Sequence, residues 1–342
     1  MKIWLRINGL QPCSWTVVWQ NLKKAFEALG CTVCATYAYD TSPLSSVDFV
    51  EVWWGDPRFW RWSGEKVLLR VGLALTEARS ILYEGRDVAI SNLGACDLII
   101  CPSLHAAVGI TEAPIDVPVT TVPFGLDCDE FHYVERDWNG TLKFLHFGTA
   151  QFRKGSWMVP EAFLRAFTSG DNVSVTVASF VPTSMFLRMR KEYGKHPQVN
   201  FVDSFFKTPF EAYQLHHVLV SPHLSEGFGL VPLEAMATGM TCMVSRCSAP
   251  REYFNSRFGW WIEMSEDYVP VSDCLPETSG FWRLPSLDSL AAGMRDVYNR
   301  RDEGRERGLQ ASVFALANYS WKSTAAGIVA AITKFLGERS IR

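Results

Sequence analysis

Two glutamates eight positions apart, Glu226 and Glu234, stand in the part of this chain that is best suited to chemistry. Glu226 directly precedes a turn that contains Gly227 and Gly229, and Glu234 comes shortly after Pro232. Ionised carboxylates accept hydrogen bonds, so two of them facing one cavity would suit a ligand rich in hydroxyl groups, such as a sugar or a ribose. The alternative is structural: Glu234 would only complement a helix N-terminus, and Glu226 would be solvated.

The residues around the two glutamates predict a strand, a turn and a helix. The apolar residues 217–221 are typical of a buried strand, and Pro232 suits the first turn of the helix that follows. Glycines in the turn let the backbone approach a ligand closely, and the free N–H groups of a helix start favour a phosphate oxygen. The segment therefore predicts a site for an anionic, hydroxyl-rich ligand that carries a diphosphate.

Residues 221–239 as a whole resemble the signature of retaining glycosyltransferases of family 4, whose usual form is E-G-F-G-L-x-x-L-E-A-M-A-x-G. Three further segments resemble the same family in the expected order. Residues 122–131 are similar to the end of its first domain, residues 144–155 with 161–163 to the start of its donor domain, and Tyr319-Ser-Trp321 to the start of its last helix. The first 110 residues match only in pattern.

This resemblance implies transfer of a hexose from a nucleotide-diphosphate sugar to an acceptor hydroxyl, with retention of the anomeric configuration. Negative charge builds up on the departing diphosphate, and by the family pattern Lys154, with Arg153 beside it, would stabilise that charge. Glu226 would hold hydroxyls of the donor sugar, and Glu234 those of the ribose. The other donor-binding residues implied are Gly148, Thr149, Gly227, Phe228, Gly229 and Leu230. A UDP-sugar is the expected donor, without a metal ion or another cofactor.

The family's fold is α/β and is named GT-B: two Rossmann-like, doubly wound domains that face each other across a cleft. The element pattern agrees, because short apolar strands alternate with helical stretches, as in parallel sheets covered on both faces. A polar turn, Asp137-Trp-Asn-Gly140, precedes a fresh strand and marks the expected domain boundary. We therefore expect an acceptor-binding domain over residues 1–138, a donor-binding domain over 139–318, and a C-terminal helix over 319–342 that returns to the first domain.

Apolar runs and periodicities give the expected elements. Strands are expected over residues 2–7, 31–39, 49–54, 66–71, 98–102, 119–122, 142–147, 173–178, 199–202, 217–221 and 241–245. Helices are expected over residues 17–29, 185–193, 210–216, from 232, and over 288–300, 305–318 and 321–336.

An aromatic segment in the first domain is the candidate for acceptor binding. Trp53, Trp54, Trp60 and Trp62 are interleaved with arginines over residues 51–62, a mixture that can stack on sugar rings or bases. The acceptor would then be a glycan, a lipid-linked or small molecule, or a modified, hydroxymethylated base of DNA. The alternative is a hydrophobic segment that packs on its own domain or touches a membrane edge. Asn8 and Gly9, after the first strand, form a candidate phosphate or acceptor loop.

The sequence departs from the family at two places. Many members have an Arg directly after the glycine that opens the donor domain, where this chain has Thr149 after Gly148. Many also have a His at the end of the fourth strand, where this chain has Arg70-Val-Gly72. A third hypothesis is therefore a non-catalytic protein that binds nucleotide sugars or glycans on the same fold.

Composition and charge narrow the class of protein. Hydrophobic residues make up 48% of the 342 residues and charged residues 20%, which is typical of a compact globular protein. The formal net charge of −3 gives no general attraction to nucleic acid or anionic lipid. Nine scattered cysteines and the absence of signal-peptide and membrane-span patterns predict a cytoplasmic location, with peripheral membrane contact left open. The sequence leaves the oligomeric state undetermined.

Overall fold

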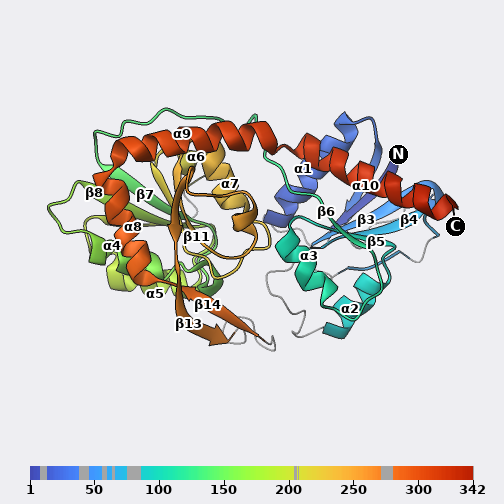
Figure 1. Cartoon of the computed structure of the whole chain (residues 1–342), viewed down its shortest axis with the longest axis horizontal. Helices are drawn as coiled ribbons and strands as arrows, with labels where there is room; N and C mark the ends of the chain where they lie inside the picture. Colours follow the sequence, from blue (N-terminus) through green and yellow to red (C-terminus); the bar gives the residue numbers. More distant parts are fainter. Residues whose placement is uncertain are drawn as a thin grey trace. The chain divides into compact units, whose positions relative to one another are not determined.

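The chain forms two compact units in the computed structural model (Figure 1). The structure describes residues 1–7, 14–37, 46–55, 60–63, 66–74, 86–203, 206, 208–270 and 280–341. The first unit contains the described residues up to Asp127 and those from Tyr319 onward, and the second contains most of those between.

The first unit is built on a six-stranded parallel sheet with strand order β2-β1-β3-β4-β5-β6. Its strands are β1 (Lys2–Ile7), β2 (Thr32–Tyr37), β3 (Phe49–Gly55), β4 (Leu69–Ala74), β5 (Leu98–Cys101) and β6 (Val119–Thr121). Its helices are α1 (Ser14–Ala28), the short η1 (Ser46–Asp48), α2 (Arg86–Gly94), α3 (Leu104–Thr111) and α10 (Trp321–Ile341). The C-terminal helix α10 packs against α1, so the predicted return to the first domain is confirmed.

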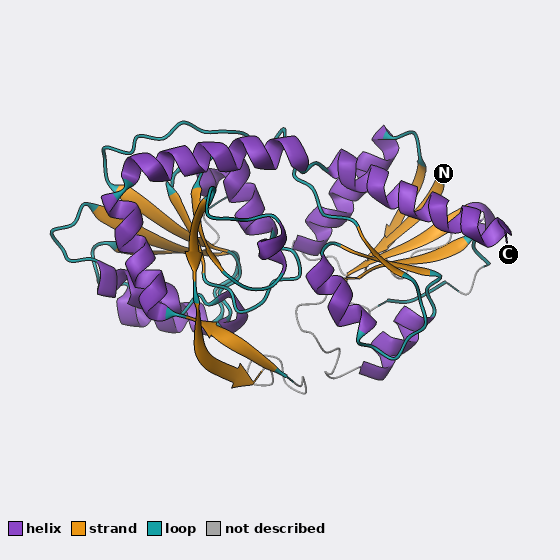
Figure 2. Ribbon diagram, in the orientation of Figure 1, coloured by secondary structure: helices purple, strands orange, loops and turns teal. Residues whose placement is uncertain are grey.

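The second unit has a parallel sheet of the same size, with order β12-β11-β10-β7-β8-β9 (Figure 2). Its strands are β7 (Leu142–Phe147), β8 (Val173–Ser179), β9 (Val199–Asp203), β10 (Val218–Ser221), β11 (Thr241–Ser245) and β12 (Gly259–Ile262). Its helices are η3 (Phe152–Lys154), α4 (Met158–Ala166), α5 (Ser184–Tyr193), α6 (Pro209–Gln214), α7 (Leu230–Ala237), η4 (Ala249–Glu252), α8 (Leu287–Asn299) and α9 (Arg301–Asn318).

The strands of the second sheet are apolar on both faces because helices cover both faces. Val218, Leu219 and Val220 of β10 are all fully buried, and β10 lies between β7 and β11 near the middle of the sheet. Parallel strands end at the same edge, so the loops after β7 and β10 emerge side by side. This placement brings the predicted basic pair close to Glu226.

An antiparallel hairpin in the second unit escaped the sequence analysis. It consists of β13 (Met264–Pro270) and β14 (Phe281–Pro285), and β13 is polar and lacks the apolar alternation of a half-buried strand. Trp282 of β14 nevertheless packs with Leu224 and Phe152, which belong to the loops after β10 and β7. The hairpin therefore supports the two loops that carry the candidate site.

The boundary between the units lies before the expected one. Residues 128–138 belong to the second unit, because Arg136 donates hydrogen bonds to the backbone oxygens of His216 (2.6 Å) and Thr238 (2.7 Å). Trp138 is buried in the core of the same unit. The polar turn at 137–140 is thus a loop within the second unit. The fourth strand is also shifted: it starts at Leu69 instead of residue 66.

Candidate functional site

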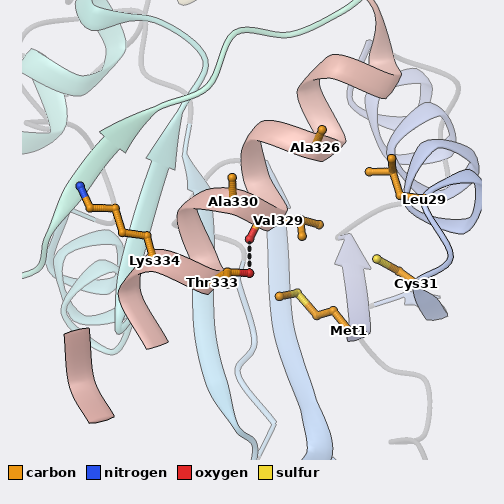
Figure 3. Close-up of a pocket in the computed structure, with 8 residues that line it drawn as sticks. All are labelled: Met1, Leu29, Cys31, Ala326, Val329, Ala330, Thr333 and Lys334. Atoms are coloured by element: carbon orange, nitrogen blue, oxygen red, sulfur yellow. Dashed lines mark hydrogen bonds between the residues drawn. The ribbon is translucent and has the colours of Figure 1, made fainter. Parts of the chain in front are cut away.

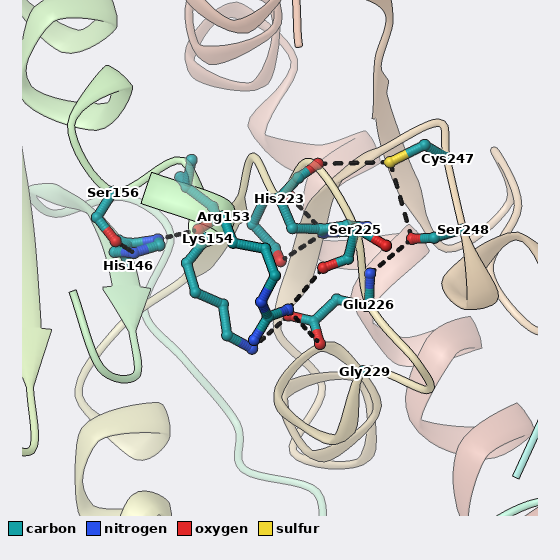
Figure 4. A network of polar contacts seen from close by, with 12 residues as sticks. His146, Arg153, Lys154, Ser156, His223, Ser225, Glu226, Gly229, Cys247 and Ser248 are labelled. Atoms are coloured by element: carbon teal, nitrogen blue, oxygen red, sulfur yellow. Dashed lines mark hydrogen bonds and ion pairs between the residues drawn. The ribbon is translucent and has the colours of Figure 1, made fainter. Parts of the chain in front are cut away.

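Arg153, Lys154 and Glu226 form one charge cluster at the carboxyl ends of β7 and β10 (Figure 4). The Lys154 ammonium forms an ion pair with Oε1 of Glu226, and Nη1 of Arg153 lies 3.4 Å from Oε2. Arg153 also donates a 2.6 Å hydrogen bond to the backbone oxygen of Ser225. The Glu226 side chain is 9% exposed, whereas that of Lys154 is 25% exposed. Two cations around one carboxylate leave a net positive charge within reach of solvent, which suits an anionic ligand.

A close backbone contact holds the two loops together. The N–H of Leu224 donates a 2.8 Å hydrogen bond to the oxygen of Arg153. Gly155 has a φ of 64°, and a Cβ at this position would lie 1.9 Å from the oxygen of Pro222. Only glycine fits both the left-handed conformation and this contact. Gly155 therefore lets the basic pair approach the loop that carries Glu226.

A third loop, after β11, fixes the backbone of Glu226. The N–H of Glu226 donates to Oγ of Ser248 at 2.9 Å, and the N–H of Ala249 donates to the oxygen of Glu226 at 3.2 Å. Ser248 has a φ of 53° and is the one non-glycine residue with positive φ in the described part of the chain. Such strain costs on the order of 1–3 kcal/mol and is typical of functional sites.

The ionisation of the cluster follows from burial and from its neighbours. Burial disfavours the charged form of Glu226, but the charges of Lys154 and Arg153 outweigh burial and hold the pKa of this carboxyl below its usual value. His223 is completely buried, and burial lowers its pKa to about 4. Its Nδ1 lies 3.1 Å from the oxygen of Ser221, and its ring is neutral near pH 7. The cluster thus keeps an ionised carboxylate between two cations.

Glu234 lies in α7 and is nearly as buried as Glu226. The hydroxyl of Tyr213 donates a 2.7 Å hydrogen bond to its Oε2. Burial raises the pKa of Glu234 to about 7. Because Glu226 is buried and paired, the alternative of a solvated Glu226 is wrong. The binding role of Glu234 stays a prediction.

The remaining predicted donor residues lie on the same loops. Gly148, with a φ of 130°, directly follows β7, and Thr149 comes next in a partly exposed position. Gly229, with a φ of 90°, directly precedes α7, which begins at Leu230, two residues before the predicted start. Gly227 and Phe228 are buried in the turn between Glu226 and α7. The ring centroid of Phe228 lies 5.6 Å from that of Tyr253, and the Tyr253 hydroxyl donates to the Gly229 oxygen at 2.6 Å.

The predicted stacking surface of tryptophans is wrong for three of the four rings. Trp53, Trp54 and Trp60 are 0%, 2% and 1% exposed, so their faces are covered by the core of the first unit. Trp62 is half-buried, and its indole N–H donates to the oxygen of Asn92 at 3.0 Å. The apolar character of β3, which contains Trp53 and Trp54, was the signal for burial. Asn8 and Gly9 lie outside the described residues.

Tyr213 and Ser248 are the site residues that sequence reasoning missed. Tyr213 is one aromatic residue in a short predicted helix, and Ser248 follows a strand like many loop serines. Their partners, Glu234 and Glu226, stand 21 and 22 positions away. The two side chains meet their partners only because the sheet places the strands before these loops and helices next to each other.

A groove of about 630 Å³ lies elsewhere, in the first unit (Figure 3). Leu29, Cys31, Val329 and Lys334 are among the residues that line it, between α10 and the amino-terminal ends of β1 and β2. Its lining is mostly aliphatic and includes none of the predicted site residues. Among the described residues, no three metal-ligating side chains lie grouped, and none of the helices has the length and apolarity needed to span a bilayer.

Comparisons with known proteins agree with this fold. Residues 141–268 match the family described as glycosyl transferases group 1. HepE from Anabaena, solved in complex with UDP-glucose, has a TM-score of 0.72 at 12% identity, with 98% of this chain and 100% of that chain covered. No curated protein matches the chain in sequence.

Two further solved structures superimpose over nearly the whole chain. Sucrose-phosphate synthase from Thermosynechococcus elongatus has a TM-score of 0.72 at 14% identity, covering 99% of this chain and 100% of that one. A glycosyltransferase from Rickettsia africae also has a TM-score of 0.72, at 10% identity with 98% of each chain covered. The chain therefore has the GT-B fold, and its residues 141–268, which hold the whole Glu226 cluster, match the group 1 glycosyl transferases.

Proposed function

We propose that this protein is a retaining glycosyltransferase that moves a hexose from a UDP-sugar to an acceptor hydroxyl without a metal ion. The observation that carries the proposal is the pair of ion contacts that Lys154 and Arg153 make with the carboxylate of Glu226. This cluster lies within the segment that matches the group 1 glycosyl transferases. HepE, which shares the fold, was solved with UDP-glucose, and this supports the choice of donor.

The chemistry that we assign to the cluster is stabilisation of the leaving diphosphate. When the bond between the sugar and the diphosphate breaks, negative charge grows on the oxygens of the leaving group. Lys154 and Arg153 are already oriented by Glu226 and by the Ser225 oxygen, so their charges need little reorganisation to meet it. Glu226 would hold hydroxyls of the donor sugar at the same time. Gly148, Thr149 and the turn from Gly227 to Leu230 would line the diphosphate.

Release of free UDP from a panel of UDP-sugars, with sugars, lipid-linked sugars and modified DNA as acceptors, tests the proposal. Glu226→Ala and Lys154→Ala should each lower turnover at least about tenfold, as expected for one charged transition-state contact. Arg165→Ala is the matched control, because it removes an exposed cation that pairs with Glu161 and Asp288 on the same unit. Wild-type turnover in both site variants would overturn the proposal.

Two other functions appear as distinct results of the same assay. Transfer only to modified DNA would make the acceptor a nucleic-acid base, an idea that loses support from the burial of Trp53, Trp54 and Trp60. Tight binding of UDP-sugars without any release of UDP would indicate a non-catalytic binding protein. The second result would refute the hexosyltransferase proposed above, whereas the first would identify its acceptor as a modified base of DNA.

A further inference from the structure

The contact between Tyr213 and Glu234 joins two different elements of the second unit. Tyr213 belongs to α6, and Glu234 belongs to α7, which follows β10. The hydroxyl donates to Oε2 of Glu234 at 2.7 Å, and Tyr213 is completely buried. A carboxylate has two oxygens that accept hydrogen bonds, so this contact leaves Oε1 for another donor.

The ring of Tyr213 is held firmly. Its centroid lies 5.3 Å from that of Phe147 and 6.0 Å from that of Phe131, in edge and tilted contacts. Its backbone oxygen accepts a 3.1 Å hydrogen bond from Arg136. Because a strand-end residue and a loop residue pack on the ring and a loop arginine binds its backbone, the hydroxyl is directed at Glu234 and orients that carboxylate.

We propose that Tyr213 is a positioning residue: it orients the Glu234 carboxylate toward a ribose hydroxyl of the nucleotide donor and keeps that carboxylate ionised in the pH range in which the donor binds. The proposal rests on the proposed function and on the ribose contact that the family resemblance implies for Glu234. Tyr213 belongs to α6, which lies outside the signature at residues 221–239.

The groups around Glu234 explain why its carboxylate needs a hydrogen-bond donor to stay ionised. Burial raises the pKa of Glu234, the Tyr213 hydrogen bond lowers it, and the negative charge of Glu130 raises it further. Cys242 also lies near Tyr213, but burial raises the pKa of its thiol, which stays neutral. The guanidinium of Arg136 binds backbone oxygens, Thr238 at the end of α7 included. The Tyr213 hydroxyl is thus the group that favours the ionised form of Glu234.

The pH dependence of binding follows from these signs. An ionised carboxylate accepts stronger hydrogen bonds than a neutral carboxyl, so affinity for the ribose falls as the pH drops through the pKa of Glu234, about 7. Loss of the Tyr213 hydroxyl raises that pKa further. The fall in affinity then begins at a higher pH.

Titration of UDP by calorimetry between pH 6 and pH 9 tests the inference. Tyr213→Phe should weaken UDP binding about tenfold at pH 7, the size expected for a hydrogen bond to a charged group. Its affinity should approach that of the wild type at the alkaline end. Tyr133→Phe is the matched control: it removes a hydroxyl that donates to Glu135, also at 2.7 Å, on the exposed surface of the same unit.

Glu234→Gln provides an independent measurement even if Tyr213→Phe folds poorly. This variant keeps the size of the side chain and loses its titration. Its UDP affinity should therefore fall less between pH 8 and pH 6 than that of the wild type, and the remaining fall is the part that comes from the terminal phosphate of UDP, whose second pKa is about 6. Added to Glu234→Gln, Tyr213→Phe should cause a much smaller loss than in the wild type, because the two groups act as one unit.

The outcomes separate the inference from the proposed function. If the wild type binds neither UDP nor a UDP-sugar, the proposed function fails. If the wild type binds UDP and both Tyr213→Phe and Glu234→Gln reproduce its pH profile, the positioning of Glu234 by Tyr213 is refuted while the proposed function stands.

Discussion

Glu51 in the first unit and Glu226 in the second are both buried carboxylates with two basic neighbours. Arg6 donates to Oε1 of Glu51 at 2.6 Å, and Nε of Arg70 lies 3.7 Å from Oε2. Ser63 adds two more hydrogen bonds to Glu51, from its N–H and its hydroxyl, each 2.9 Å long. Among the described residues, the carboxylate of Glu226 is bound by Lys154 and Arg153.

The difference between the two sites lies in the cation closest to each carboxylate: the side chain of Arg6 is 4% exposed and that of Lys154 is 25% exposed. Glu51 projects from the middle of β3, and the guanidinium of Arg6 lies between the rings of Trp4 and Trp53, 4.5 and 4.6 Å from their centroids. Glu226 projects from a loop, and the lysine that pairs with it reaches solvent. A carboxylate whose acceptor positions are filled by fixed donors stabilises a fold. One whose closest cation is partly exposed can exchange partners with a ligand.

The largest effect should come from breaking the fixed pair. Glu51→Ala leaves the guanidinium of Arg6 buried without its carboxylate, a change that typically costs about 3–5 kcal/mol. We expect a large drop in the melting temperature of the first unit. Circular dichroism and hydrogen exchange of the β1 and β3 amides would measure this drop. An unchanged melting curve would show that the two carboxylates do not differ in the way described.

A smaller effect should follow from Glu226→Gln, and it should depend on pH. The pKa of Glu226 is lower in the folded protein than in the unfolded chain. The ion cluster therefore contributes stability above the unfolded pKa, near 4.5, and this contribution is lost as the pH falls toward the folded pKa, about 2. The difference in melting temperature between wild type and Glu226→Gln should shrink between pH 6 and pH 3. A constant difference over this range contradicts the prediction.

Ser248 offers the smallest and most specific test. Ser248→Gly removes the strain of the positive φ and also the hydrogen bond to the Glu226 N–H, two changes of about 1 kcal/mol each with opposite sign. Ser248→Ala loses the bond and keeps the strain. We expect the Gly variant to melt near the wild type and above the Ala variant, while both turn over the donor a few times more slowly. Full turnover in both variants would show that Ser248 does not position Glu226.

The sequence predicted the parts of the molecule that depend on local pattern or on a long motif. β1, β7 and β11 have the predicted bounds, because each is a short run of apolar residues with clear ends. The family resemblance placed Lys154 and Glu226 in one site, and the two side chains do form an ion pair although they are 72 positions apart. The position of this pair follows from the order of strands, because β7 and β10 are neighbours in the parallel sheet.

Contacts between distant segments could not be predicted. Tyr213 carries no sign of its partner, since its hydroxyl reaches Glu234 only after α6 and α7 pack on the same sheet. The burial of Trp60 depends on Gly72, where a Cβ would lie 2.5 Å from the indole ring. The hairpin β13–β14 is polar along one strand and is stabilised by Trp282 on loops that are remote in sequence.

The close contact of Gly155 with Pro222 has a consequence for the order in which the protein matures. The two loops meet only when β10 has joined β7, so a chain that ends before residue 226 has the cations but lacks the carboxylate. The pair of Lys154 and Glu226 therefore forms only after the central strands of the second sheet, β7 and β10, have paired.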